Sequence, residues 1–286
     1  MADRKDPPDQ TWTYQQVAEK AAATRDAIAG LGIKMHRDCA LSKLLKEAEA
    51  LARDWEAGRS GENWINRLMA AAHSNRISDA IAACLPDTGA VECIRRMCSN
   101  GLDISGRDPS RGKDALWELD LAGFMKRRGV STIHEDPPDL IADFGFGPYP
   151  IACKKIYSER GIESQVRNGA KQLERYGRPG LVAINFDDLA PANALLQSQT
   201  QISASDFLAK LNHEVIERNQ ARLQRFIVDG RCDGILVSTT TLADIVNSTT
   251  RFNTHTQTTL WTLSSIGEEQ SDRIARIRSA LEMAPV

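Results

Sequence analysis

The sequence has little net charge of either sign, no long hydrophobic run and no paired cysteines. Its 36 Lys and Arg residues stand against 38 Asp and Glu residues, which gives a net charge of −2. This balance excludes a chain that coats nucleic acid or membranes through bulk charge, so any site for a polyanion must be local. No stretch approaches the ~18 apolar residues that a membrane span needs, and the charged beginning does not resemble a signal peptide. We therefore expect a cytoplasmic protein without membrane contact.

The six cysteines and five histidines are scattered along the chain. This spacing supports neither a disulfide framework nor a zinc site, and it indicates small buried thiols in a reducing compartment. Hydrophobic residues make up 42% of the 286 residues and charged residues 26%, which is typical of a folded chain and not of a disordered one. The length allows one large domain or two ordinary ones.

The first hundred residues predict helices and no strand. Apolar residues recur at helical spacing in stretches that begin near Thr11, Leu41 and Trp64, with Thr11 as a helix cap. A fourth stretch follows Asp87, which we expect to be its N-cap. The polar, glycine-containing residues 100–113 predict a linker. The first part is therefore expected to be all-helical.

The hydrophobic period changes after this helical domain, which we assign to residues 1–110, and residues 111–286 predict a mixed α/β domain. The expected order is helix, three strands, helix and strand, at Asp114–Arg128, Val130–His134, Asp139–Phe144, Tyr149–Ile156, Glu163–Tyr176 and Gly180–Phe186. Beyond these we expect a long helix, a short buried strand, an edge strand and a charged C-terminal helix, the first three at Ser205–Val228, Gly234–Ser238 and Leu260–Leu263.

Residues 137–156 hold the side chains that can carry chemistry. Their pattern predicts a β-hairpin with glycine and proline in its turn. Strand alternation lets Asp139 on the first strand and Lys154 on the second converge at the mouth of the hairpin. Phosphodiester hydrolysis uses such a group, because carboxylates hold Mg²⁺ and an ammonium group can orient water.

This hairpin resembles the motif of the PD-(D/E)xK nuclease superfamily, which is a Pro-Asp, a gap, and then an acidic residue, any residue and a lysine. Pro138-Asp139 matches the first part and Lys154 the last. The resemblance covers residues 114–186, and the expected order of elements is that of the restriction-endonuclease-like core. It implies a metal-dependent phosphodiesterase, namely a DNA endonuclease of restriction or bacterial defence, with RNA left open as a substrate.

One position departs from the motif, because Ala152 stands where the family carries an acid. A methyl group binds no metal, so we expect low activity of this chain. Two explanations compete, a naturally degenerate relative that only binds and an inactive form in which alanine replaced the acid. Because Asp139, Lys154, Glu118 and Gln172 all remain, we favour the second.

The resemblance also implies a metal site. Mg²⁺ or Mn²⁺ would be held by Asp139, by the residue at position 152 and by the carbonyl of Cys153, with Glu118 as an outer ligand and Asp120 as the competing acid. A third explanation for Ala152 is that the missing carboxylate has moved to a neighbouring element, where the nearest candidates are Asp143 and Glu163.

The remaining roles concern the nucleic acid. The resemblance implies that Lys154 positions the attacking water, and Gln172 with Tyr176 resembles the Gln-xxx-Tyr element of RecB-like and Cas4-like nucleases. Residues 151–180 hold seven Lys and Arg against three Asp and Glu, a local excess of +4 that suits a phosphate backbone. The backbone contacts we expect come from Lys155, Arg167, Lys171 and Tyr176.

Two other classes of function stay open. In the first, the nuclease-like core is a scaffold for a DNA-binding or protein-interaction module, and Ala152 is the natural residue. In the second, the helical domain is an adaptor that recruits a protein partner or forms a homodimer.

Overall fold

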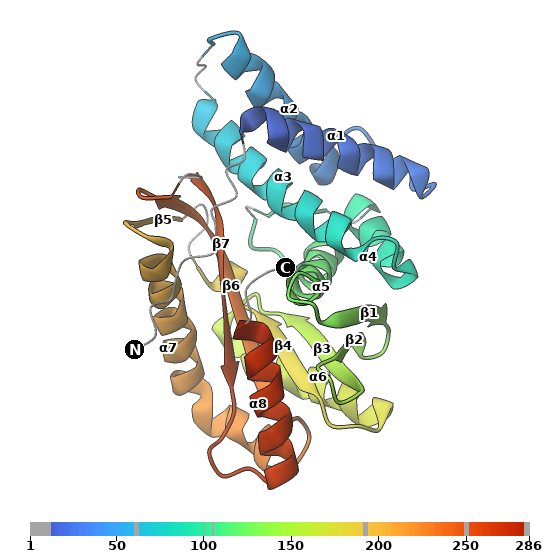
Figure 1. Ribbon diagram of the computed structural model, residues 1–286, viewed down its shortest axis with the longest axis vertical. Coiled ribbons are helices and arrows are strands. Elements are labelled where there is room, and N and C mark those ends of the chain that lie inside the picture. The colour runs from blue at the N-terminus through green and yellow to red at the C-terminus, as the bar shows by residue number, and fades with distance from the viewer. Residues whose placement is uncertain are drawn as a thin grey trace.

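The computed structural model describes residues 13–59, 63–99, 101–104, 106–190, 194–248 and 252–282. A stack of helices forms one end of the molecule, and a mixed sheet flanked by helices forms the other (Figure 1). The helices of the N-terminal region are α1 (Tyr14–Gly30), α2 (Ala40–Glu56), α3 (Trp64–Cys84), α4 (Thr88–Ser99) and α5 (Arg111–Lys126). The predicted α/β class and the helical N-terminal region are confirmed, while the domain boundary at residue 110 stays a prediction.

Polar side chains begin these helices. The hydroxyl of Thr13 accepts a hydrogen bond from the N–H of Gln16 at 3.2 Å, and the Gln16 side chain accepts one from the N–H of Thr13 at 2.7 Å. This reciprocal capping box starts α1, whereas the predicted cap, Thr11, lies outside the described residues. Asp87 accepts a hydrogen bond from the N–H of Gly89 at 2.9 Å, the contact expected of a cap at the start of α4.

The sheet has seven strands in the order β1-β2-β3-β4-β6-β5, and β7 pairs with β6. Pairing is antiparallel within β1-β2-β3 and between β6 and β7, and parallel between β3 and β4, β4 and β6, and β5 and β6. The strands are β1 (Ser131–Glu135), β2 (Asp139–Asp143), β3 (Pro148–Lys155), β4 (Leu181–Asn185), β5 (Leu195–Ser198), β6 (Gly234–Ile245) and β7 (Phe252–Trp261).

The expected order of helix, three strands, helix and strand is present as α5, β1, β2, β3, α6 (Ile162–Tyr176) and β4. α5 begins earlier than the sequence predicts, at Arg111 and not at Asp114. Ser110 caps this helix through a hydrogen bond from the N–H of Lys113 at 3.1 Å, so three residues expected in the linker are helical.

The strands of the C-terminal part differ most from expectation. β6 continues seven residues beyond the predicted end at Ser238, β7 begins at Phe252 and not at Leu260, and β5 was not predicted. The cause is a run of threonines, which are good strand formers when they pair across strands. Thr240 and Thr256 face each other and their hydroxyls lie 2.9 Å apart. Similarly, α7 (Gln201–Val228) begins before the predicted Ser205, because Thr200 caps it.

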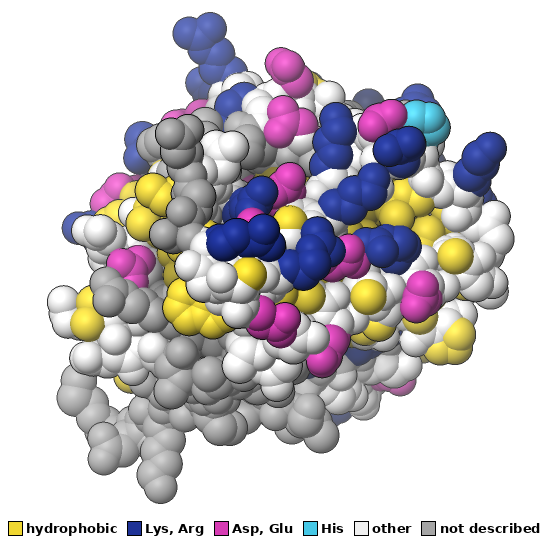
Figure 2. All heavy atoms as spheres, turned by 90° about the horizontal axis from the view of Figure 1, so that it is seen from above, with side chains coloured by type: hydrophobic (Ala, Val, Ile, Leu, Met, Phe, Trp, Pro, Cys, Tyr) yellow, Lys and Arg dark blue, Asp and Glu magenta, His cyan; other side chains and the backbone are white. Residues whose placement is uncertain are grey.

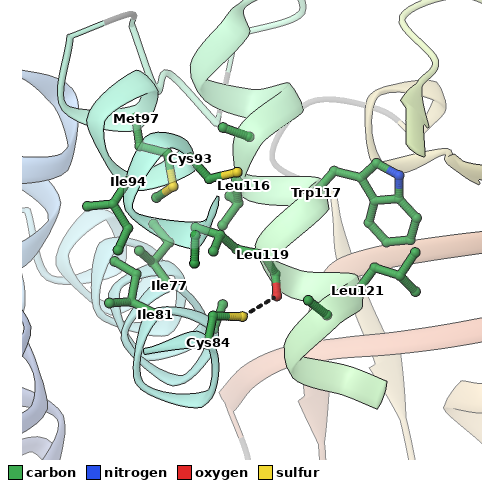
Figure 3. Close-up of a cluster of buried hydrophobic side chains, with 14 of the residues drawn as sticks. Ile77, Ile81, Cys84, Cys93, Ile94, Met97, Leu116, Trp117, Leu119 and Leu121 are labelled. Carbon is green, nitrogen blue, oxygen red and sulfur yellow. Dashed lines mark hydrogen bonds between the residues drawn. The ribbon is translucent and has the colours of Figure 1, made fainter. Parts of the chain in front are cut away.

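Helices cover both faces of the sheet. Apolar side chains of α5 and of α8 (Glu268–Glu282) belong to a hydrophobic cluster on one face, whereas those of α6 and α7 belong to a second cluster on the other. Figure 3 shows how α3, α4 and α5 meet through Ile81, Ile94 and Leu119, and the thiol of Cys84 donates a hydrogen bond to the carbonyl of Leu119 at 3.5 Å. α5 is thereby fixed between the helical stack and the sheet. No helix in the described part of the chain is long and apolar enough to cross a membrane.

Candidate functional site

The β2–β3 hairpin brings the motif residues together. Asp139 begins β2 and lies opposite Ala152 on β3, so the position at which the motif has an acid is the cross-strand neighbour of Asp139. β3 then continues to Lys155 beside β4, which places Lys154 just beyond the first residue of β2. Asp139 has a φ of 115°, a region that costs a non-glycine residue about 1–3 kcal/mol. The surrounding contacts must therefore hold Asp139 in place.

The carboxylate of Asp139 accepts hydrogen bonds from three different positions of the chain. The N–H of Cys153 and the ammonium group of Lys154 donate to Oδ2 at 2.7 and 3.0 Å, and the side-chain amide of Gln172 donates to Oδ1 at 3.3 Å. Gln172 comes from α6, so a helix and two strands converge on one carboxylate. The structure thus brings together three of the predicted site residues, Asp139, Lys154 and Gln172.

This group is shielded from water. The side chain of Asp139 is 11% exposed and that of Lys154 is 15% exposed. Burial raises the pKa of Asp139 to about 6, although the charge of Lys154 and the hydrogen bonds from Lys154 and Cys153 act to lower it. The negative charge of Glu118 raises the pKa of Asp139 further. The carboxyl group therefore changes its charge at a mildly acidic pH.

Glu118 lies near this group, but a cation from α4 holds its carboxylate. Nη1 of Arg96 lies 3.1 Å from Oε1 of Glu118, and Nη2 lies 2.5 Å from Oε2. The thiol of Cys93 also donates to Oε2, at 3.1 Å. Sequence reasoning singled out Glu118 but missed Arg96, because a pairing across 22 positions leaves no local pattern.

Ala152 is buried between the sheet and Gly169 of α6. It has no exposed surface, and a Cβ added to Gly169 of α6 would lie 3.5 Å from its methyl group and 2.7 Å from Cγ1 of Val182. Two small residues, Ala152 and Gly169, therefore face each other across this contact. A longer side chain at position 152 would have to extend along the sheet toward Asp139, its neighbour across the ladder.

The donors implied for Mg²⁺ or Mn²⁺ are engaged by cations of the chain. Lys154 donates to Asp139 and, at 2.7 Å, to the carbonyl oxygen of Cys153, and Arg96 holds Glu118. Within the described residues, no group of three or more His, Cys, Asp or Glu side chains is placed to hold a metal ion. The residues present do not fit a divalent cation, because both candidate carboxylates are already paired with cations of the chain.

The basic residues predicted to contact a phosphate backbone are not all at this site. Lys155 points away from it and is buried, with Nζ 2.6 Å from Oδ1 of Asn185 and 3.0 Å from Oδ2 of Asp188. Alternation along β3 explains this, because Lys154 and Lys155 must point to opposite faces. Lys155 is thus part of a buried charge cluster and does not join Lys154.

The other predicted contacts lie on α6. Arg167 forms an ion pair with Glu163 one turn away, Lys171 is exposed beside Gln172, and Tyr176 is half-buried one turn beyond Gln172. Lys171 is therefore the predicted backbone contact that lies open to solvent next to the site.

None of the alternative acids takes the place of the missing carboxylate. Asp143 accepts hydrogen bonds from the N–H groups of Gly145 and Gly147, at 2.8 and 3.1 Å, and so closes the hairpin turn. Glu163 forms ion pairs with Arg167 and with Arg225 of α7. Asp120, the competitor of Glu118, is held by Arg76 of α3 with Nη2 2.5 Å from Oδ2.

A polar cavity of about 60 Å³, which no sequence pattern predicted, lies at the C-terminal ends of β3 and β4 and beside the middle of β6. Asp188 lines it and forms ion pairs with Arg107 at 3.2 Å, Lys113 at 3.5 Å and Lys155 at 3.0 Å. These ion pairs join the beginning of α5 to the segment that follows β4. They also explain how Lys113 and Lys155 can be buried, since each has an opposite charge beside it.

Comparison with protein-family models, with curated proteins and with solved structures finds no match to this chain.

Proposed function

We propose that this chain carries a phosphodiesterase site of the PD-(D/E)xK nuclease type, directed at DNA, which is inactive as long as residue 152 is alanine. One observation carries the proposal. Asp139 and Lys154, which match the motif, lie 3.0 Å apart, and Gln172 from α6 donates to the same carboxylate. The order of α5, β1, β2, β3, α6 and β4 and their pairing agree with the core that this motif occupies.

Each residue has a role that follows from its contacts. Lys154 is the cation that would orient water and stabilise the negative charge that develops on a phosphate. Gln172 holds the carboxylate of Asp139 toward Lys154, and its own Oε1 is buried without a hydrogen-bond partner among the described residues. That oxygen is available to accept a hydrogen bond from a water molecule in the site. Lys171, exposed beside Gln172, suits a contact with a backbone phosphate.

The dependence on Mg²⁺ or Mn²⁺ belongs to a chain with an acid at position 152. Because Asp139 and Ala152 are opposite each other, their Cβ atoms are separated by roughly 5 Å, and a carboxylate at position 152 would lie beside that of Asp139. It would add the donor that the present residues lack.

The test is cleavage of supercoiled plasmid by the Ala152→Glu and Ala152→Asp proteins with Mg²⁺, beside the same proteins carrying Lys154→Ala. We expect cleavage that needs both the acid and Lys154. If neither acidic variant cleaves any form of DNA or RNA while both remain folded, the proposal is wrong. The aspartate variant is included because its shorter side chain fits more easily beside Gly169.

A second function is favoured by the packing around Ala152. Ala152 is fully buried facing Gly169, and the carboxylates of Asp139 and Glu118 are paired with Lys154 and Arg96, so the present side chains form a site without an open position for a metal ion. A binding-only module would retain DNA affinity in the unaltered chain, and electrophoretic mobility shifts with and without a chelator test this directly.

The helical region offers a surface for a partner in either case. Figure 2 shows the face at the helical end of the molecule, where Lys and Arg side chains gather near the centre with Asp and Glu side chains among and around them. Mixed charge of this kind does not form the continuous basic strip that a polyanion would need. Light scattering of the full chain during size-exclusion chromatography measures whether it self-associates.

A further inference from the structure

The polar cavity at the C-terminal ends of β3 and β4 has three cations on one wall. They come from separate segments: Arg107 precedes α5, Lys113 lies in the first turn of α5, and Lys155 ends β3. All three pair with Asp188, at 3.2, 3.5 and 3.0 Å. The side chains of Lys113 and Lys155 are only 4% and 5% exposed, so water does little to screen them. One carboxylate cannot neutralise three cations, and positive charge is left at this wall.

The other charged groups of the cavity do not remove this excess. Among the described residues that line the cavity, four Lys and Arg stand against two Asp. The fourth cation, Arg76, is paired with Asp187 at 2.9 Å and with Asp120 at 2.5 Å. Asp120, Asp103 and Asp114 are not among the residues that line the cavity. An anion inside it would therefore meet more positive than negative groups.

Two side chains of the cavity have hydrogen-bonding atoms left for a ligand. Among the described residues, Arg107 donates only through Nη1, to the carbonyl of Asp187 and the carboxylate of Asp188, so Nε and Nη2 can donate to an anion. Nδ1 of His73 is buried without a hydrogen-bond partner. Burial and the charge of Arg76 lower the pKa of His73 to about 4, so the ring is neutral at pH 7 and still carries one N–H.

We propose that this cavity binds an oxyanion of the size of phosphate, as free phosphate or as the phosphate group of a nucleotide. The volume of about 60 Å³ corresponds to roughly four to six water-sized spheres, which is enough for a phosphate group. The carboxyl ends of parallel strands are where α/β sheets commonly bind ligands. Arg107, with a side chain that is 34% exposed, connects the cavity to solvent. This site does not depend on the proposed function, because Lys155 and Lys154 lie on opposite faces of β3.

The experiment is isothermal titration of the full chain with inorganic phosphate at pH 7, at an ionic strength held constant with sodium chloride. We expect one phosphate to bind per chain. Arg107→Gln should weaken this binding by roughly tenfold to a hundredfold, the scale of hydrogen bonds between charged groups. The matched control is Arg111→Gln. Arg111 is exposed at the beginning of α5 and does not line the cavity, so its loss should leave the affinity within about twofold.

Two further measurements place the phosphate in the cavity. Arg107→Lys keeps the charge but loses the fork of N–H groups, so it should bind phosphate with intermediate affinity, and it supplies the answer if the glutamine variant fails to fold. The nitrogen NMR signals of His73 should shift as phosphate is added, whereas those of His213, exposed on α7, should not. Phosphate that does not bind, or that binds equally well with Arg, Lys and Gln at position 107, would overturn the proposal.

The source of the phosphate group is decided by titration with a nucleoside 5′-monophosphate and with the same nucleoside lacking phosphate. Equal affinity for the monophosphate and for inorganic phosphate assigns the site to free phosphate. Monophosphate binding that is more than about tenfold tighter, and that is weakened by Arg107→Gln, assigns it to a nucleotide. A nucleoside that binds as tightly as its monophosphate would contradict recognition of an anion.

Discussion

Replacing Asp139 by asparagine should change the pH dependence of stability in a direction that follows from its burial. The pKa of Asp139 is raised from 3.8 to about 6 in the folded chain. A shift of roughly 2 units corresponds to about 3 kcal/mol at 1.36 kcal/mol per unit. Because the folded state binds this proton more tightly than the unfolded state, the stability that it contributes is fully present below about pH 4 and is lost as the pH rises through 6.

Asparagine has nearly the same shape as aspartate but cannot ionise, so the Asp139→Asn protein does not lose stability at this position as the pH rises. The free energy of unfolding of Asp139→Asn, measured relative to the unaltered chain, should therefore rise by about 2.4 kcal/mol between pH 4 and pH 7. The assay is urea unfolding followed by circular dichroism at half-unit steps of pH. Asp143→Asn, in the hairpin turn, is the control for removal of one carboxylate from the same hairpin.

The ion pair with Lys154 forms only as Asp139 ionises, so its effect is already contained in the pKa of Asp139, and the slope is the diagnostic quantity. A difference in unfolding free energy that stays constant within about 0.5 kcal/mol from pH 4 to pH 7 would refute the reasoning, as would a slope of opposite sign. Either result would mean that Asp139 is not buried as described.

Two further predictions concern the packing that supports the site. Gly169→Ala places a methyl group 2.7 Å from Cγ1 of Val182 and should lower the free energy of unfolding by about 1–3 kcal/mol, whereas Gly30→Ala, where no atom lies within 4 Å, should not destabilise the chain. Urea unfolding of both variants measures this, and equal stability would contradict the close approach of α6. Lys155→Ala leaves Asp188 with fewer buried partners and should cost about 3–5 kcal/mol, against less than about 0.5 kcal/mol for the exposed Lys171→Ala. If the urea midpoint of Lys155→Ala lies close to that of Lys171→Ala, the buried cluster around Asp188 contributes little to stability.

The helices and the hairpin of the candidate site could be predicted because their signals are local. Asp139 and Lys154 are set by strand alternation and a short turn, so their convergence follows from the sequence. Gln172 was singled out only by the resemblance of residues 172–176 to a known nuclease element, because no spacing in the sequence places this residue near Asp139. Its side-chain amide lies 3.3 Å from Oδ1 of Asp139.

The features that the sequence did not predict depend on contacts between segments far apart in the chain. Arg96 and Glu118 come from two helices whose packing is fixed by apolar side chains, and no pattern marks them as partners. Lys155 was predicted to contact a phosphate backbone, yet the pleat sends it to the face opposite Lys154 and into the cluster around Asp188. The length of β7 was underestimated because threonine carries no strong hydrophobic period, and only pairing with β6 makes it a strand.

We propose that one carboxylate at position 152 separates this chain from a working phosphodiesterase. The most direct measurement is the rate of nicking of supercoiled plasmid, as a function of Mg²⁺ concentration, by Ala152→Glu and by Ala152→Gln, which have nearly the same size and differ in charge. Nicking by the glutamate protein that rises with Mg²⁺ and saturates, with none by the glutamine protein, is the predicted result. Equal rates for the two folded proteins at every Mg²⁺ concentration would contradict it.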